Sequence, residues 1–512
     1  MFRIMTADEA VQLIDDNAWL GLNPFLSLSI PHALHDAIMR RYLQTGHPNH
    51  LNIYSPCGFG VWDEHRAADQ YAAKGAVQRV VTSHYASIPA IARMTQQNEI
   101  EAYCLPLGVM SHSIRDAAAG YPGHLSHVGL DLFVDPRRDG PGLNERSRDE
   151  WVQLVELRGE EYLYYKTPEI DVALIKGTSV DPMGNISFSD ECVICDALAL
   201  AQATKARGGT VIVQVDRVSH TFERPRSVII PGILVDVVVV DYVKPDEHIK
   251  AMDGSIHVPG SQMDYWMAHL ARTSTGKAKQ PSTAHSVIGQ HAAQLLRKGD
   301  VVNIGIGIPE MVGQAASSSG ILRDIVLTVE SGGLGGLPAP GQLFGATIGA
   351  DCIVSMAEQF DFYDGGGLSI CFMGALEMDS EGNVNAHQLP DKVVGIGGFA
   401  NITSAAKTVV FCLTTTAKGL EIAQDEQGTL RIVQEGQLPK FKKKIGAISF
   451  SAKQALARGQ RVLYVTERCV FELTEAGLRL AEVYPGIDRD RDVLPHLEFP
   501  LAYPATWQAE QI

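Results

Sequence analysis

The sequence predicts an α/β protein built from two homologous α/β domains with mainly parallel sheets. Three observations lead to this prediction: the length, the alternation of strand and helix patterns, and an internal repeat. The chain has 512 residues, of which 45% are hydrophobic and 20% charged, as in a large globular protein of about two to four domains. Short β-branched runs separated by helical patterns are typical of parallel sheets covered by helices, and they occur at 211–215, 235–240 and 409–413.

The internal repeat supports two domains. Residues 177–187 read GTSVDPMGNIS and residues 375–385 read ALEMDSEGNVN, so a Gly-Asn pair follows an acidic turn in both, 198 positions apart. A Thr-Val pair begins an apolar run at 210–211 and again at 408–409, with the same separation. Each match is short, and chance similarity is the alternative, but the matches keep their order along the chain.

An insertion distinguishes the two halves. Ile-Pro turns at 30–31 and 308–309, each followed by a helical pattern, are 278 positions apart, so the first half carries about 80 more residues before its Gly-Asn pair. The polar stretch RTSTGKAKQPS at 272–282 is the longest between strongly patterned segments. We therefore expect an N-terminal domain at 1–272, a linker at 273–282 and a C-terminal domain at 283–512.

The elements that open the second domain follow in order. Apolar residues at helical spacing from Val287 to Leu296 predict a helix that Gly299 ends. A strand is predicted at 301–306, a helix at 310–317 and a buried strand at 325–329. Ligands of such folds bind beyond the carboxyl ends of strands, so the turns after these strands are the first places to look for a site.

Charge and hydropathy argue against several classes of function. The 43 Lys and Arg against 59 Asp and Glu give a net charge of −16, which opposes binding to nucleic acid or an anionic membrane. The longest apolar run, 229–243, contains Pro231 and Asp236 and is shorter than the roughly 20 residues that span a bilayer, so we expect one or two buried strands there. The N-terminus shows no signal-peptide pattern, and we expect a cytoplasmic protein.

The eight cysteines predict neither a disulfide framework nor a metal site. Six lie in apolar or Gly-rich surroundings, and Cys192 and Cys195 form a lone CxxC. A structural zinc site needs four ligands, and no second CxxC or close His pair follows. We therefore expect buried thiols, no bound metal and no permanently bound cofactor.

Two glycine-rich turns of the second half are candidates for ligand contact. The segment NIGIGIP at 303–309 places two glycines before a helix whose free N–H groups suit an anionic ligand, although a tight structural turn is the alternative. The segment VGIGGF at 394–399 either brings N–H groups together as an oxyanion hole requires, or allows a sheet and a helix to cross closely. Between them, the aromatic segment 359–367 belongs either to an acyl pocket or to the core.

A third turn, TVESGGLGG at 328–336, carries a single carboxylate. Glu330 stands at the end of a predicted buried strand, before four glycines in six residues that leave room for a substrate. An ionised carboxylate can attack an activated acyl group without a separate base. The alternative is a glutamate that caps a turn or a helix.

Taken together, these motifs resemble the ordered set of family I coenzyme A transferases, and the fused acetate, propionate and 3-keto-acid type is closest. The motifs are GIGIP at 305–309, ESGGLGG at 330–336, FDFYDGGG at 360–367, EGNVN at 381–385 and GIGGF at 395–399. Similar segments in the first half lie at 108–123, 129–140, 171–191 and 227–236, so the resemblance covers about residues 25 to 485. It implies two homologous domains, in agreement with the repeat.

The resemblance also implies roles for individual residues. Glu330 is similar to the nucleophilic glutamate that becomes a glutamyl-CoA thioester. Gly397 and Gly398 resemble the backbone oxyanion loop, and Asn385, more than Asn383, resembles an asparagine that assists it. The loop on the CoA side corresponds to Gly305, Ile306, Gly307, Ile308 and Pro309. The first-half counterpart at 21–31 lacks the GxGxP spacing, so we expect that half to support the site without housing a second one.

The implied function is transfer of CoA from a short-chain acyl-CoA to an acceptor carboxylate, by ping-pong kinetics, in a homo-oligomer. CoA is then a substrate. One alternative is an acyl-CoA hydrolase on the same scaffold, which needs a base near Glu330, and no His or Asp flanks that residue in sequence. Another is a non-catalytic acyl-CoA-binding subunit, but binding alone has no use for an anion beside an anionic cofactor.

Overall fold

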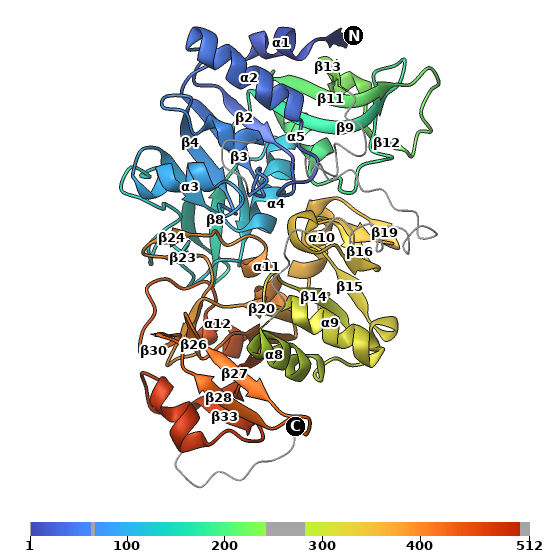
Figure 1. Cartoon of the computed structure of the whole chain (residues 1–512). Helices are drawn as coiled ribbons and strands as arrows, with labels where there is room; N and C mark the ends of the chain where they lie inside the picture. The colour runs from blue at the N-terminus through green and yellow to red at the C-terminus, as the bar shows by residue number, and fades with distance from the viewer. Residues whose placement is uncertain (1, 63–66, 242–281, 502–512) are drawn as a thin grey trace.

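The computed structural model describes residues 2–62, 67–241 and 282–501 and shows two α/β halves. In Figure 1 the first half, blue to green, lies above the second half, yellow to red. Each half is built on one large sheet. The site described below depends on how these two sheets are ordered and on how their helices meet.

The first sheet has eight strands in the spatial order β1-β13-β11-β9-β2-β3-β4-β5, and all neighbours on this path are parallel. β10 (Ile186–Ser187) and β12 (Val228–Ile230) extend β9 as antiparallel strands. The eight strands are β1 (Arg3–Met5), β2 (Trp19–Leu22), β3 (Leu51–Ser55), β4 (Val77–Thr82), β5 (Glu101–Cys104), β9 (Val172–Val180), β11 (Thr210–Val218) and β13 (Val237–Val240).

The second sheet has the order β19-β16-β15-β14-β20-β25-β31-β32-β33. Its five central strands are parallel, and antiparallel strands extend it on both sides. The strands are β14 (Val301–Ile304), β15 (Val326–Thr328), β16 (Gly333–Leu334), β19 (Cys352–Ile353), β20 (Ile370–Gly374), β25 (Thr408–Cys412), β31 (Arg461–Val465), β32 (Cys469–Thr474) and β33 (Gly477–Val483).

The two sheets share one strand order and one register. The parallel path β3-β2-β9-β11-β13 of the first half matches β15-β14-β20-β25-β31 of the second. Val172 lies opposite Leu20 and Thr210, and 198 residues later Ile370 lies opposite Val302 and Thr408. The predicted fold class, two related α/β units with mainly parallel sheets, is confirmed.

The Gly-Asn pairs of the repeat form equivalent turns. In the first half the Asn185 side chain donates from Nδ2 to Asp181 at 3.0 Å, and in the second half Asn383 donates to Asp379 at 3.1 Å. The glycine before each asparagine has a φ of +83° and +91°, a backbone region that glycine adopts without strain. The repeat in the sequence therefore corresponds to one turn structure used twice.

Helices of both halves meet between the sheets. α10 and α11 pack against each other and against α4 of the first half, whereas α8 and α9 pack together and contact β14, β25 and β31 (Figure 1). The helices are α1 (Ala7–Ala10), α2 (His32–Thr45), α3 (Pro89–Gln96), α4 (Leu107–Ala118), α5 (Ala197–Ala206), α8 (Thr283–Ala293), α9 (Glu310–Ser319), α10 (Met356–Asp364), α11 (Phe399–Ala405) and α12 (Ala452–Ala457).

Smaller sheets decorate both halves. They are β6-β8-β7 (Gly123–Ser126, Glu160–Lys166, Val152–Leu157), β17-β18 (Leu337–Pro338, Thr347–Ile348), β22-β21-β30 (Val384–Asn385, Glu377–Asp379, Phe441–Lys442), β23-β24 (Gln388–Leu389, Lys392–Val393), β26-β29 (Thr416–Ala417, Leu438–Pro439) and β27-β28 (Glu421–Gln424, Leu430–Gln434). The first-half segment with the predicted extra residues contains β4, α3, β5 and the β6-β8-β7 sheet.

The boundaries of the elements differ from the prediction in places. α8 ends at Ala293, six residues before Gly299, because the N–H groups of Gln294, Leu295 and Leu296 donate to carbonyls three residues back and tighten the chain. β14 ends at Ile304 and not at 306. The predicted linker lies outside the described residues except for Ser282, so the limits of the two domains stay a prediction.

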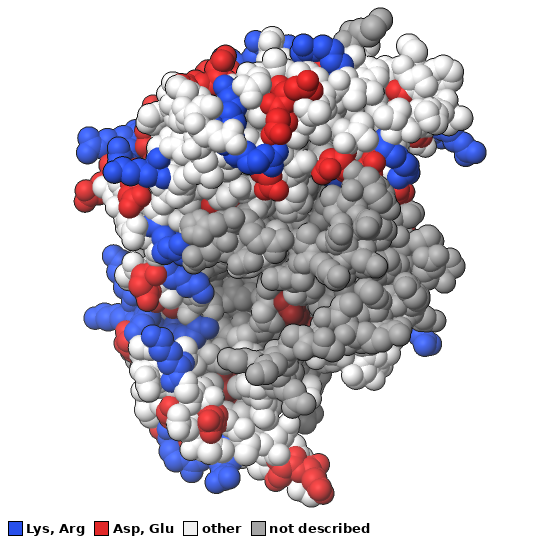
Figure 2. All heavy atoms as spheres, turned by 45° about the horizontal axis from the view of Figure 1, so that its top comes forward, with Lys and Arg blue, Asp and Glu red and all other residues white. Residues whose placement is uncertain are grey.

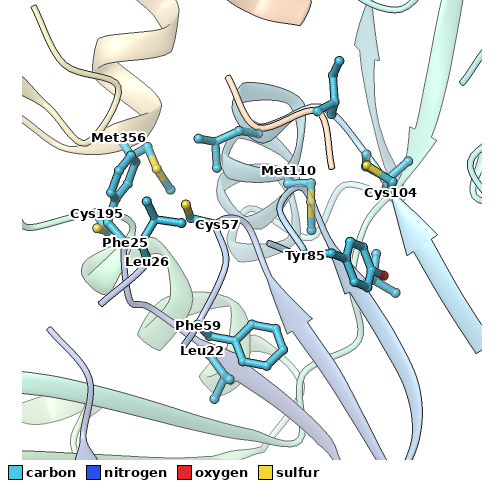
Figure 3. Close-up of a cluster of buried hydrophobic side chains, with 14 of the residues drawn as sticks. Leu22, Phe25, Leu26, Cys57, Phe59, Tyr85, Cys104, Met110, Cys195 and Met356 are labelled. Atoms are coloured by element: carbon cyan, nitrogen blue, oxygen red, sulfur yellow. The ribbon is translucent and has the colours of Figure 1, made fainter. Parts of the chain in front are cut away.

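The hydrophobic core crosses from one half to the other. One cluster of buried apolar side chains extends from Ala10 to Phe499. Figure 3 shows part of it, with Met356 of α10 beside Phe25 and Cys195 of the first half. The Met356 N–H donates to the Cys195 carbonyl at 3.1 Å. Loops of the first half are thereby packed against the second half.

Seven of the eight cysteines are buried, but Cys352 of β19 is exposed, so the expectation of buried thiols is wrong at that position. In the apolar run, Val237, Val238 and Val239 are buried, whereas Ile233 is exposed. Cys192 and Cys195 are free and buried, and burial raises the pKa of Cys195 well above its usual range. The described residues hold no group of three or more side chains that could bind a metal ion. The run at 229–243 contributes to β12 and β13, as expected, up to the last described residue, 241.

The last two features of the fold are the length of its helices and the distribution of charge on its surface. None of the helices in the described ranges is both long and apolar enough to span a bilayer. On the face shown in Figure 2, Lys and Arg side chains are interspersed with Asp and Glu over the described residues.

Candidate active site

A cavity of about 330 Å³ lies where the two halves meet. The second half contributes the loops that carry Gly305, Glu330 and Gly398. The first half contributes Phe25, Leu26, Cys57, His84 and Leu107, and the first three of these lie close together in Figure 3. The cavity is therefore shared between the halves.

Glu330 occupies a chain reversal at the carboxyl end of β15. Thr328 pairs in parallel with β14 and antiparallel with Leu334 of β16, so the chain turns back between them. Gly332 has a φ of +113°, and a Cβ there would lie 2.0 Å from the Val354 carbonyl oxygen. Only glycine fits this crossing, which fixes Glu330 at the tip of the turn.

The Glu330 carboxyl is buried, with 8% of the residue exposed. Its Oε2 atom has no hydrogen-bond partner among the described residues. Burial raises the pKa of Glu330 to about 7, while its own backbone amide and the Asn303 side chain act in the opposite direction. The carboxylate is thus poorly solvated, as a nucleophile in an apolar cavity would be.

Polar side chains lie behind the turn that carries Glu330. The Tyr363 hydroxyl donates to Thr328 Oγ1 at 2.9 Å, and Asn303 donates from Nδ2 to the Tyr363 hydroxyl at 3.3 Å. Asn303 also donates to the Thr328 carbonyl. These bonds tie β14, β15 and α10 together and fix the strand end from which Glu330 projects.

The predicted CoA-side loop forms the turn between β14 and α9. Gly305, Ile306 and Ile308 line the cavity, and Gly307 and Pro309 stand beside them in the turn. Gly307 has a φ of +88°, and its N–H donates to Glu310 Oε1 at 2.9 Å. The N–H groups of the first helical turn, from Glu310 to Val312, donate to carbonyls three residues back. The expectation of free N–H groups at this helix start is therefore wrong, although the loop still lines the cavity.

The GIGGF loop lies against both Glu330 and the first half. A Cβ on Gly398 would lie 2.8 Å from Glu330 Cγ, so the Gly398 backbone directly contacts that side chain. The Gly398 N–H has no recorded acceptor in the described part of the chain. Gly395 has a φ of +90°, and a Cβ there would lie 2.4 Å from the Ser83 carbonyl oxygen.

Two of the predicted oxyanion groups are corrected by the structure. The Gly397 N–H donates to the Ser83 carbonyl at 2.9 Å and is not free for an oxyanion. Asn385 is also engaged, since its Nδ2 donates to Glu377 at 2.8 Å and to the Gln388 carbonyl at 2.7 Å. Asn385 stabilises a turn and does not line the cavity, because a neighbouring carboxylate and carbonyl accept from its amide.

Two of the three aromatic residues at 359–367 belong to the core, and the third, Phe362, is exposed. Phe360 and Tyr363 are fully buried in α10 and do not line the cavity, whereas Phe399 does. Sequence reasoning also missed the first-half wall. His84 and Cys57 follow the carboxyl ends of β4 and β3, so the strand-end rule, applied to the first half, could have found them.

The sequence matches the family described as "Coenzyme A transferase" over residues 4–241 and 287–493. The chain belongs to this family. The matched ranges include both sheets and every loop of the cavity. The fold and the family therefore agree with the resemblance of the sequence motifs to family I coenzyme A transferases.

Relatives of similar length share this family. The acetate CoA-transferase YdiF of Escherichia coli K12 is 38% identical over 97% of this chain and 92% of its own. The caffeate CoA-transferase of Acetobacterium woodii is 36% identical over 99% of this chain and 96% of its own. The crystal structure of YdiF from E. coli O157:H7 as a thioester complex with CoA matches with a TM-score of 0.86 at 37% identity, over 98% of this chain and 93% of that one. The protein is accordingly a CoA-transferase, and CoA is part of its reaction.

Proposed function

We propose that this CoA-transferase moves CoA from a short-chain acyl-CoA to an acceptor carboxylic acid through a thioester of CoA with Glu330. The observation that carries the proposal is the Glu330 carboxyl, buried with an unpaired oxygen in a largely apolar cavity at a strand end. The CoA thioester of YdiF, a relative with the same fold, supports it.

The first half-reaction forms the thioester. A Glu330 oxygen attacks the acyl carbonyl carbon of the donor, the C–S bond breaks, and CoA leaves as a thiolate. The thiolate then attacks the Glu330 carbonyl carbon of the resulting mixed anhydride. The donor acid leaves as a carboxylate, and the acceptor acid runs the same steps in reverse. Thioester free energy is conserved because no step uses water.

The Gly398 N–H is the proposed donor to the oxyanion on the Glu330 carbon. Its backbone contacts the Glu330 side chain, and its amide has no recorded acceptor among the described residues. A fixed amide donor stabilises a developing oxyanion without reorganisation. Gly305, Ile306 and Ile308 are the proposed contacts of CoA, since their loop opens onto the cavity at the start of α9.

The proposed acyl group is short and aliphatic. Phe25, Phe344 and Phe399 line the cavity, and the relative YdiF is named an acetate CoA-transferase. We therefore assign short aliphatic acids as substrates. We also assign a cytoplasmic location, which the eight free cysteines support, and a homo-oligomeric state, which light scattering of the purified protein tests.

A CoA-transfer assay tests the proposal. With acetyl-CoA as donor, acetate, propionate, butyrate, acetoacetate and caffeate are compared as acceptors, and acetate is followed by isotope exchange. We expect transfer to the short acids with parallel double-reciprocal plots, the pattern of a ping-pong mechanism. Release of free CoA without an acceptor, at the rate of transfer, would instead identify a hydrolase.

A further inference from the structure

The cavity contains a second polar side chain, and it comes from the first half. Among the described residues that line the cavity, Glu330 and His84 are the two whose side chains contain oxygen or nitrogen. The side chains of the others contain only carbon or sulfur, or are absent, as in glycine. A polar side chain in such surroundings needs a partner. Glu330 has a role in the proposed function, but His84 does not.

The backbone holds His84 firmly against the loop beside Glu330. On one side of it, the Ser83 carbonyl accepts from Gly397 at 2.9 Å. On the other side, the N–H groups of Tyr85 and Ala86 donate to the Val394 carbonyl at 2.8 and 3.1 Å. His84 itself forms a β-bridge with Gly395. The histidine and the GIGGF loop are thus one hydrogen-bonded unit, although they are more than 300 positions apart in sequence.

The imidazole ring has an unused nitrogen. Nδ1 is fully buried and has no hydrogen-bond partner among the described residues. A Cβ on Gly58 would lie 3.1 Å from this Nδ1 and 2.3 Å from the Ser87 hydroxyl, which is also buried and unpaired. Neither atom is hydrogen-bonded among the described residues, and the proposal below places the ring hydrogen on Nε2.

The ring is neutral under ordinary conditions. Burial lowers the pKa of His84 to about 4, so near pH 7 it carries one N–H donor and no charge. A neutral donor suits a carboxylate that must remain a nucleophile, since a full positive charge would hold it too tightly.

The reaction requires a second oxyanion donor. Two carbons become tetrahedral in turn, the Glu330 carbonyl carbon and the acyl carbon of the substrate. The Gly398 backbone contacts Glu330, and its N–H is the proposed donor to the first. The second carbon belongs to the substrate and is separated from the Glu330 carbon by the bridging oxygen of the anhydride. We therefore expect a different hydrogen-bond donor for the oxyanion on this second carbon.

We propose that His84 donates a hydrogen bond from Nε2 to the acyl oxygen of the substrate, and so both receives the acceptor carboxylate and stabilises its tetrahedral intermediate. The inference rests on the proposed function. One oxygen of the acid attacks the Glu330 thioester carbon, and the C–S bond breaks to release CoA thiolate. The thiolate then attacks the acyl carbon, and the bond to the bridging oxygen breaks, which returns the electron pair to Glu330. The other oxygen of the acid carries the negative charge, and His84 stays neutral throughout.

A pair of similar-sized variants tests this role. His84→Gln keeps an N–H donor, whereas His84→Met has nearly the same shape without one. Exposed His220, which does not line the cavity, provides the control His220→Met. For each protein, kcat/KM for propionate is measured with acetyl-CoA as donor. After prolonged incubation with acetyl-CoA alone, borohydride-trapped Glu330 is also quantified by peptide mass.

We expect His84→Met to lose about 100-fold in kcat/KM for propionate, the usual effect of removing one oxyanion donor. The kcat/KM of His84→Gln should be at least about tenfold higher than that of His84→Met. The kcat/KM of His220→Met should match the wild type. Every variant should still yield the adduct at Glu330 at the end point. Transfer by His84→Met within about twofold of wild type, or equal loss in both His84 variants, overturns the inference alone. A wild-type enzyme without the Glu330 adduct overturns the proposed function together with it.

Discussion

At the scale of single residues, the environment of Glu330 matters more than its identity. A glutamate in water is ionised and well solvated at pH 7, which makes it a weak nucleophile. In the cavity it has an unpaired Oε2 and a pKa raised by burial to about 7. The strand end and the glycine-rich turn could be predicted from sequence, but this desolvation could not, because five of the twenty residues that line the cavity come from the other domain.

The raised pKa predicts a pH dependence of thioester formation. Only the ionised carboxylate attacks, so kcat/KM for acyl-CoA should fall about tenfold per pH unit below about pH 6 and level off above about pH 8. Rapid-mixing measurements with acetyl-CoA alone would give this profile. A rate that is constant from pH 5 to pH 8 would contradict a buried Glu330 nucleophile with this pKa.

The same pKa predicts that Glu330 destabilises the fold. The folded-state pKa of about 7 lies above the ordinary value of 4.5, so folding disfavours the ionised form. This corresponds to roughly 3 kcal/mol of unfolding free energy, present below about pH 4.5 and lost as the pH rises through about 7. Glu330→Gln should therefore stabilise the protein by up to that amount at pH 8 and not at pH 4, as measured by denaturant unfolding.

The exposed Glu475 provides the matched control for this comparison. Glu475→Gln should change the unfolding free energy by less than about 0.5 kcal/mol at either pH. If Glu330→Gln destabilised the protein at pH 8, the carboxylate would have a partner that the structure does not show.

At the scale of elements, the loops of the site are held by backbone bonds between segments distant in sequence. The GIGGF motif was open to two interpretations, a close crossing or an oxyanion hole. The structure shows the close crossing at two of its glycines, and the oxyanion role stays a proposal for Gly398. Gly395 and Gly397 meet the backbone of the first half, whereas Gly398 meets Glu330. Sequence alone cannot divide these roles, since the partner, Ser83, lies in the other domain.

The CoA-side loop gives a prediction at this scale. Gly307 has a φ of +88° and open space around its Cβ position, and the same holds for Gly299, with a φ of +86°. A valine at either position meets the same backbone strain, about 1 to 2 kcal/mol. Gly307→Val should in addition raise KM for acyl-CoA at least about tenfold, because this loop is the proposed CoA contact.

Thermal melting and steady-state kinetics on both variants separate the two effects. Gly299→Val should lower the melting temperature about as much as Gly307→Val does, but its KM for acyl-CoA should equal that of the wild type. Equal KM values for Gly307→Val and wild type would remove this loop from the CoA site.

At the scale of the whole molecule, the site exists only because the two halves pack together. The order of the elements and the duplication were visible in the sequence, since they depend on local hydrophobic patterns and on repeated motifs. The packing of α4 onto α10 and α11 was not, because it depends on contacts between residues about 250 to 300 positions apart. Asn385 was misassigned for a different reason, since its partners Glu377 and Gln388 are near in sequence but meet its side chain only in the folded turn.

Asn401 is a buried link between the halves. Its side chain accepts from the Gly108 N–H of α4 at 3.1 Å and donates to Asp364 of α10 at 3.0 Å. Asn401→Ala would leave a buried amide and a partly buried carboxylate without this partner, which should cost about 2 to 4 kcal/mol of unfolding free energy. Chemical denaturation measures this, and a loss below about 0.5 kcal/mol would show that the halves do not depend on this link.

The central claim is that Glu330 is the covalent nucleophile, and chemical trapping tests it most directly. The enzyme is incubated with acyl-CoA and no acceptor, treated with borohydride, digested and analysed by peptide mass. A thioester is reduced under these conditions, whereas a free carboxylate is not, so the account predicts a primary alcohol in place of the carboxyl at residue 330 and none without acyl-CoA. An adduct at another residue, or wild-type transfer by Glu330→Ala, would contradict it.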